Sequence, residues 1–220
     1  MLDTFMDKGV QLGLFEIKAL KDLEGSCASS ASTDVIDYDL VKEKIYKDMN
    51  SGGIKFNQPK SCDALKILPE ENRLDFIEIK GIKFFCDNLK ERRKCNPERE
   101  MDRAVKKFDL NTKIVQSLDL FKLLLQIEGF EIKNGDKKAI LKDVRKNYLI
   151  VIDEEVEKDY AMVFGAQMDF LSKTSNYNDQ MVIKLKSAVE GIDVVGVSKP
   201  ILLCHSDVDA YYQSITRIAN

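Results

Sequence analysis

Asp63 and the tripeptide Glu78-Ile79-Lys80 are the residues of this chain whose types suit chemistry on a phosphate group. Two carboxylates close together can bind a hard cation such as Mg²⁺, which takes oxygen ligands from one or two carboxylates and leaves other positions to water and phosphate. Such a cation lowers the pKa of a bound water, and a neighbouring ammonium can stabilise developing negative charge. This chemistry requires the fold to bring residue 63 beside residues 78–80.

The residues in between predict one β-hairpin. Two runs rich in apolar residues, 62–68 and 74–80, flank Pro69-Glu70-Glu71-Asn72, whose residue types are typical of a turn. If these four residues form the loop, Leu68 pairs with Arg73 and Asp63 pairs with Glu78. Paired side chains lie about 5 Å apart at Cβ, and residues two apart share a face, so Lys80 joins both acids.

Apolar residues occupy both faces of this predicted hairpin. Leu65, Ile67, Leu74 and Phe76 share the face of the acids, and Ala64, Leu68, Ile77 and Ile79 share the other. Both faces are therefore expected to be covered by protein, where uncompensated charges cost several kcal/mol each. A divalent cation is the natural compensation. The alternative is an ordinary cross-strand ion pair on an edge hairpin, which contributes little stability.

Glu-x-Lys alone carries little information, because short motifs recur by chance. It occurs three times here, at Glu16, Glu78 and Glu131. The middle copy differs from the others, because a plausible hairpin sets an aspartate opposite it.

In this context the residues resemble the PD-(D/E)xK nuclease superfamily, which carries an aspartate on one strand and Glu/Asp-x-Lys on the next. Residues 59–63 and 75–80 match that pattern. Cys62 stands where the pattern has proline. Some relatives carry Gln-x-x-x-Tyr on the following helix, whereas Gln116 is followed at that spacing by Leu120.

The resemblance implies a metal-dependent nuclease that hydrolyses phosphodiester bonds in DNA or RNA. Asp63, Glu78 and Lys80 would be its catalytic residues. Mg²⁺ or Mn²⁺ would be held by Asp63, Glu78, the Ile79 carbonyl and Glu43 on the preceding helix. Relatives of this size work in restriction, antiviral defence or repair, as homodimers or beside a helicase or ATPase subunit. The alternative is an inactive nuclease-like fold that acts as a protein-interaction or inhibitor module.

The elements expected around the hairpin indicate an α/β (α+β) fold with a mixed central sheet flanked by helices. The resemblance implies a restriction-endonuclease-like αβββαβ core over about 34–152, with 153–220 as a C-terminal α/β addition to a single domain, 1–220. The expected helices are 34–49, a long region broken near residues 96–97 and 111, 155–172 and 208–218. Beside the hairpin, the expected strands are 54–56, 82–85, 147–153, 181–186 and 201–205.

Charge is distributed unevenly along the chain. The 220 residues carry a net charge of −3, which argues against coating nucleic acid through bulk charge. Residues 90–107, however, hold eight basic side chains against four acidic ones. Arg92, Arg93, Lys94 and Arg99 are the predicted contacts to a nucleic-acid backbone, the alternative being a solvated helix face.

Other features narrow the class of protein. The first 15 residues are interrupted by Asp3, Asp7 and Lys8, and no apolar run is long enough to span a bilayer, so we expect a cytoplasmic protein with no membrane partner. The five cysteines form no Cys-x-x-Cys pair, and His205 is the single histidine. Reduced thiols are therefore expected, and a zinc site is not.

Overall fold

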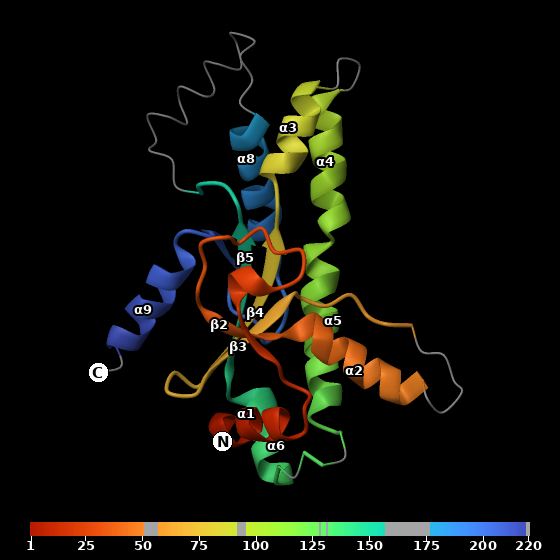
Figure 1. Cartoon of the computed structure of the whole chain (residues 1–220), viewed down its shortest axis with the longest axis vertical. Coiled ribbons are helices and arrows are strands. Elements are labelled where there is room, and N and C mark those ends of the chain that lie inside the picture. The colour runs from red at the N-terminus through yellow and green to blue at the C-terminus, as the bar shows by residue number, and fades with distance from the viewer. Residues whose placement is uncertain (51–56, 92–95, 128, 131, 157–176, 219–220) are drawn as a thin grey trace.

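The computed structural model describes residues 1–50, 57–91, 96–127, 129–130, 132–156 and 177–218, and these form a mixed sheet flanked by helices (Figure 1). Six strands in the described residues make one sheet, ordered as they occur in the chain. The first four run antiparallel, and the last two run parallel to the fourth. The strands are β1 (Ile17–Ala19), β2 (Asp34–Asp37), β3 (Ala64–Leu68), β4 (Arg73–Lys80), β5 (Arg145–Ile152) and β6 (Ile201–Cys204).

The helices lie before, between and after these strands in the chain. They are α1 (Leu2–Gln11), α2 (Tyr38–Asn50), α3 (Lys83–Glu91), α4 (Pro97–Phe108), α5 (Leu110–Leu124), α6 (Asn134–Lys142), α8 (Tyr177–Glu190) and α9 (Val208–Ile218), with a 3₁₀ turn at Leu20–Asp22. None of the helices in the described part of the chain combines the length and the apolar character needed to cross a membrane.

The hairpin β3–β4 has the predicted register. Residues 69–72 form the turn, and Leu68 pairs with Arg73 and Lys66 with Asp75. Asn72 closes the turn with φ 46°, and its N–H donates to the Pro69 carbonyl at 3.0 Å. Proline presets the first turn position and asparagine tolerates the left-handed conformation, so the residue types explain the turn. Continuing this pairing by one position sets Asp63 opposite Glu78.

Each face of the sheet has its own apolar core, because successive strand residues point to opposite faces. One core joins Leu65, Phe76 and Ile150 to α1, α2, α5 and α8. The other joins Ala64, Ile77 and Leu149 to α9 and residues 20–31. In Figure 1, α4 and α5 form a column on one side of the strands, and α9 lies on the other. The hairpin is thus covered on both faces, as predicted.

The column bends where α4 meets α5. Asn96 caps α4, its side chain accepting from the Arg99 N–H, and Pro97 occupies the first turn. Asp109 then adopts φ 52° and ψ 42°, which ends α4 and redirects the chain into α5. The two breaks lie close to those predicted.

Three predicted elements are wrong, two because contacts distant in sequence override local patterns and one because the local pattern is ambiguous. Residues 34–37 form β2 between β1 and β3, so the helix starts at Tyr38. Residues 83–85 begin α3, because the Asp153 carboxylate accepts from the Ile82 and Lys83 N–H groups. Residues 181–186 belong to α8, since a short apolar run fits strand and helix alike.

Three further predicted elements are confirmed, and two lie mostly or wholly outside the described residues. Strand 147–153 corresponds to β5, strand 201–205 to β6 and helix 208–218 to α9. Residues 54–56 and most of 155–172 lie outside the described residues. Cys27, Cys62, Cys86 and Cys204 are free thiols.

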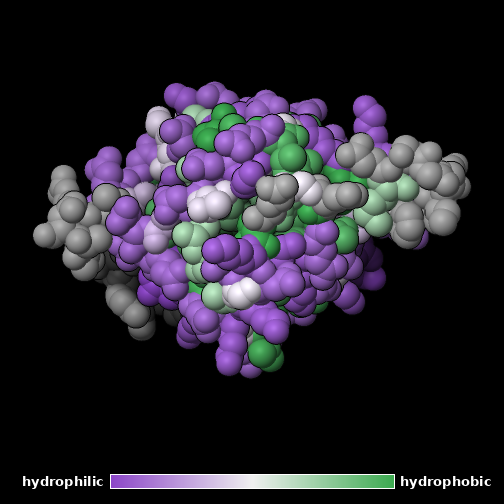
Figure 2. Space-filling view, turned by 90° about the horizontal axis from the view of Figure 1, so that it is seen from below, coloured by the Kyte–Doolittle hydropathy of each residue, from purple (hydrophilic) through white to green (hydrophobic). Residues whose placement is uncertain are grey.

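The molecular surface is ordinary for a chain with this composition. The end that carries α1 and α6 is hydrophilic over most of its area, with smaller apolar areas between (Figure 2). Some apolar residues of these helices, such as Phe5 and Ile140, are buried, whereas Val10 of α1 and Leu141 of α6 are exposed.

Candidate active site

Asp63 and Glu78 meet on the face of the sheet that α5 covers. The Asp63 carbonyl accepts from the Tyr38 N–H at 3.0 Å, which fixes the chain just before β3. The Asp63 carboxylate accepts from the Ile79 N–H at 2.6 Å, and this bond links the two halves of the hairpin. The Glu78 side chain is fully buried.

Two lysines neutralise these carboxylates. Lys80 Nζ forms an ion pair with Glu78 Oε1 and donates to the Ile79 carbonyl at 2.9 Å. Lys113 Nζ, from α5, lies 2.5 Å from the same Glu78 oxygen and 4.0 Å from Asp63 Oδ1. The described site therefore contains two carboxylates and two ammonium groups, gathered from β4, α5 and the residue before β3.

One oxygen of the site remains without a partner. Glu78 Oε2 is buried and finds no hydrogen-bond donor among the described residues. A buried acceptor in this state costs free energy, because it has lost its bonds to water. An additional ligand at this oxygen would remove that cost.

The protonation of the site reflects its burial. Burial raises the pKa of Glu78 to about 7, the Asp63 carboxylate adds to the rise, and the two lysines oppose it. Burial likewise raises the pKa of Asp63. Burial lowers the pKa of Lys113, but the Glu78 and Asp63 carboxylates raise it by more, so the pKa of Lys113 is raised overall. With a pKa of about 7, the Glu78 carboxyl thus needs more positive charge than the two lysines provide in order to ionise fully at neutral pH.

The donor set fits a hard cation. Asp63 and Glu78 supply carboxylate oxygens, the Ile79 carbonyl follows Glu78 directly in sequence, and Glu78 Oε2 has no described partner. Mg²⁺ commonly takes one or two carboxylates and keeps several waters. Within the described residues no group of three or more histidine, cysteine, aspartate or glutamate side chains is placed to hold a metal ion, so an ion here would have Asp63 and Glu78 as its side-chain ligands.

Glu43 is not brought to this site. It is exposed on α2, and no contact in the described part of the chain links it to Asp63 or Glu78. The acid of α2 that acts on Asp63 is Asp39, which contributes to the raised pKa of Asp63. Asp39 Oδ1 accepts from Ser61 Oγ and Lys42 Nζ, each at 2.5 Å. Helix α2 starts at Tyr38, beside Asp63, and Glu43 lies about one helical turn beyond Asp39, farther from the acids.

The predicted nucleic-acid contacts are only partly described. Arg92, Arg93 and Lys94 lie outside the described residues. Arg99 is exposed on α4, and its N–H takes part in the Asn96 cap. Two other members of the same basic run, Arg103 and Lys107, line a cavity beside the acids.

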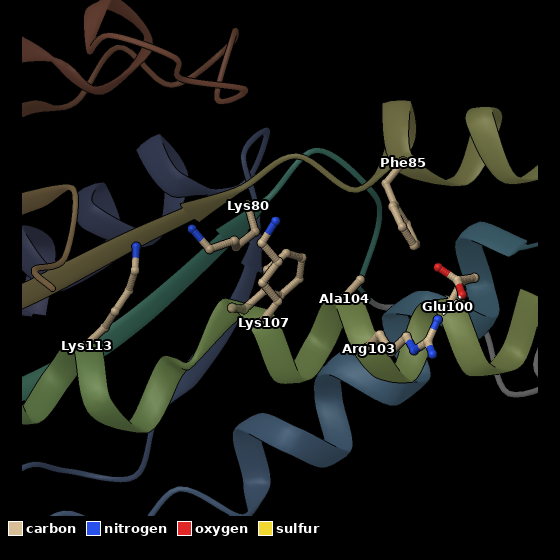
Figure 3. A pocket seen from close by; sticks show the side chains of 8 residues that line it. Lys80, Phe85, Glu100, Arg103, Ala104, Lys107 and Lys113 are labelled. Carbon is tan, nitrogen blue, oxygen red and sulfur yellow. Dashed lines mark hydrogen bonds and ion pairs between the residues drawn. The ribbon is translucent and has the colours of Figure 1, made fainter.

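This cavity has a volume of about 470 Å³ and lies between the end of β4 and the α4–α5 column (Figure 3). The ammonium groups of Lys80 and Lys113 project into the same space (Figure 3). Its lining residues are Lys80, Phe85, Glu100, Arg103, Ala104, Lys107, Phe108 and Lys113. Lys80 and Lys113 therefore join the buried carboxylates to a basic cavity.

Lys113 and the cavity residues of α4 were not among the predicted site residues. Helical spacing could have grouped Glu100, Arg103 and Lys107 on one face of a helix. No sequence signal selects Lys113 from the chain's many lysines, because its role depends on how α5 packs against β4.

Comparisons of the chain with protein-family models, with curated proteins and with solved structures each returned no match. Functional inference therefore depends on the geometry of the site.

Proposed function

We propose that this protein is a metal-dependent nuclease that hydrolyses phosphodiester bonds in DNA or RNA. The observation that carries the proposal is the fully buried Glu78, with one oxygen shared by Lys80 and Lys113 and the other without a described partner, opposite Asp63. Buried acids with perturbed pKa values beside a basic cavity are typical of catalytic sites.

The strand order supports a restriction-endonuclease-like core. Strands β2, β3 and β4 form an antiparallel series, helices α3 to α6 follow, and β5 returns parallel to β4. Asp63 lies directly before β3 and Glu78 lies on β4, so the two acids belong to successive strands of that series, as the resemblance implies. Helix α2 differs from the expected order, because it separates β2 from β3 instead of preceding three consecutive strands.

The residues divide the chemistry between them. Asp63, Glu78 and the Ile79 carbonyl would hold Mg²⁺ or Mn²⁺, which supplies a water of lowered pKa and neutralises phosphate charge. Lys80, in contact with both Glu78 and the Ile79 carbonyl, would orient the attacking water or stabilise charge on the phosphate. Lys113, which reaches the same Glu78 oxygen from α5, would hold that carboxylate in place and add a second positive charge to the site.

A second function has a specific observation in its favour. Without any ion, the site already contains as many ammonium groups as carboxyl groups, two of each. An inactive nuclease-like module that binds another protein would keep such a balance as structure alone. Calorimetric titration with Mn²⁺ separates the two functions, since the module should show no binding that Asp63→Asn removes.

Cleavage assays test the proposal directly. Wild type, Glu78→Gln and Lys80→Ala are incubated with single- and double-stranded DNA and RNA, with Mg²⁺, Mn²⁺ or a chelator. We expect cleavage that requires the cation and falls about 100-fold or more in both variants. Mn²⁺ binding should weaken in Glu78→Gln and persist in Lys80→Ala. Lys138→Ala, an exposed change on α6, is the control. Activity that survives in both site variants would overturn the proposal.

A further inference from the structure

The cavity beside the acids is made by one face of α4. Glu100, Arg103, Ala104 and Lys107 all line it, and their spacing of three and four residues places them in one row along the helix. Ala104 lies in the middle of that row, and its small side chain leaves the space that longer neighbours surround. The left-handed Asp109 then turns the chain so that Lys113 of α5 also lines the cavity.

Positive charge dominates the cavity wall. Lys80 and Lys113 are engaged with Glu78, and Arg103 pairs with Glu100 at 2.7 Å. Lys107 is exposed and has no ion-pair partner within the described residues. An anionic group in the cavity would therefore meet one unpaired ammonium and three further cations.

The rest of the wall is apolar and aromatic. Phe85 of α3 and Phe108 of α4 line the cavity, and Lys80 Nζ lies 5.7 Å from the Phe108 ring centroid. Figure 3 shows Phe85 opposite the α4 face that carries Ala104. The ligand that suits this wall has a negative charge at one end and a flat apolar surface at the other.

A nucleotide has both properties. Small-molecule sites occupy about 300–1,000 Å³, and the cavity, at about 470 Å³, lies within that range. Cationic grooves combined with aromatic side chains are how proteins bind single strands, because bases stack on the rings while phosphates meet lysine and arginine. In a duplex the base faces are already stacked and paired, and freeing one costs a few kcal/mol.

We propose that the cavity holds one unpaired nucleotide of a single-stranded DNA or RNA segment next to the acids. This inference rests on the proposed nuclease function and narrows it to substrates that are single-stranded, or frayed, at the position bound. Phe85 provides the stacking surface, and Lys107 and Arg103 contact the phosphate.

The test measures binding without cleavage. Fluorescence anisotropy is recorded in EDTA with labelled single strands of about 12 nucleotides, one DNA and one RNA, and with the matching duplexes. We expect at least one single strand to bind about tenfold or more tightly than its duplex. Lys107→Ala should weaken that binding several-fold and reduce the dependence of log K on log salt by about 0.7.

Matched variants on neighbouring residues separate stacking from general effects. Phe85→Leu keeps apolar volume but removes the ring, and it should weaken binding about five- to tenfold. Phe84→Leu is the control, because Phe84 is the preceding residue and is 78% exposed. Ala104→Leu fills the cavity without changing charge and should weaken binding at least as much. Lys138→Ala controls for the loss of one surface charge.

Each outcome bears on one proposal or the other. Three results would overturn the cavity proposal even if cation-dependent cleavage were intact. They are equal affinity for single strand and duplex, absence of single-strand binding, and equal effects of Phe85→Leu and Phe84→Leu. Single-strand binding that responds to Phe85, Ala104 and Lys107, with no cleavage under any cation, would support it and overturn the nuclease function.

Discussion

The two oxygens of the Glu78 carboxyl group have different surroundings. Oε1 contacts two lysines, whereas Oε2 is buried without a described donor. Its partner across the hairpin, Asp63, is instead held by the Ile79 N–H. The two carboxyl groups consequently have different environments, and they should respond differently to substitution and to pH.

The pH dependence of the free energy of unfolding should show the ionisation of Glu78. Its pKa rises from the ordinary 4.5 to about 7 in the folded protein. Between these values the folded state binds a proton that the unfolded state has released, so stability falls as pH rises through this window. The full effect is up to about 3 kcal/mol. Urea denaturation at pH 5 and pH 8 without divalent cations should show Glu78→Gln gaining stability relative to wild type at pH 8. Identical pH profiles would contradict this expectation.

Lys113→Met should separate cation binding from catalysis. Removing this ammonium takes away a competitor for Glu78 Oε1, so calorimetry should show Mn²⁺ binding as tightly as in wild type or more tightly. Cleavage should fall about tenfold or more, because positive charge beside the reacting phosphate is lost. Lys122→Met, an exposed change on α5, is the matched control. Weaker Mn²⁺ binding in Lys113→Met would show that the lysine supports the cation instead of competing with it.

At the scale of elements, sequence patterns predicted those helices and strands that are held by contacts between residues close in sequence. The hairpin followed from two runs rich in apolar residues and a four-residue turn, and its observed register agrees with that prediction. Elements defined by distant contacts were missed. Residues 34–37 form a strand because β1 and β3 lie on either side, and α3 starts where Asp153, 71 positions from Ile82, caps its first N–H groups. The choice of Glu43 failed for the same reason, since it depended on where α2 begins.

The bend at Asp109 gives a prediction at this scale. Its φ of 52° is in the left-handed region, which glycine adopts freely and alanine does not. Both Asp109→Gly and Asp109→Ala remove the contact with Lys60 Nζ, so glycine controls for that loss. We expect Asp109→Ala to be about 1 kcal/mol less stable than Asp109→Gly. It should also cleave more slowly, because a straighter column would move Lys113 relative to Lys107. Equal stability and activity would contradict this role for the bend.

At the scale of the molecule, the second face of the sheet carries a buried polar cluster at the end of β4 opposite Lys80. Arg73 donates to Asp75 through two bonds of 2.6 and 2.7 Å and also contacts the Tyr211 hydroxyl. Asn147 Nδ2 donates to Asp75 at 2.8 Å. The cluster connects β4, β5 and α9, and the sequence did not predict it, because Asn147 and Tyr211 are distant in sequence from Asp75.

Breaking this cluster should destabilise the fold without touching the site. Arg73→Met leaves Asp75 buried and short of a partner, and should cost about 3–5 kcal/mol in the free energy of unfolding. The double variant Arg73→Met/Asp75→Leu removes both charges and should recover part of that loss. Urea denaturation measures both, and cleavage per folded molecule should stay near the wild-type value. A double variant less stable than Arg73→Met would contradict the pairing.

The order of strands in the sheet, β1 to β6 as in the chain, has a consequence for synthesis. Every strand pairs with the one made just before it, so the sheet can grow at one edge as the chain leaves the ribosome. Asp63 and Glu78 can meet once residue 80 has left the ribosome, and Lys113 emerges before β5. During that interval Lys80 is the one described ion-pair partner that Glu78 can have, and the burial that raises the Glu78 pKa in the finished fold is not yet complete.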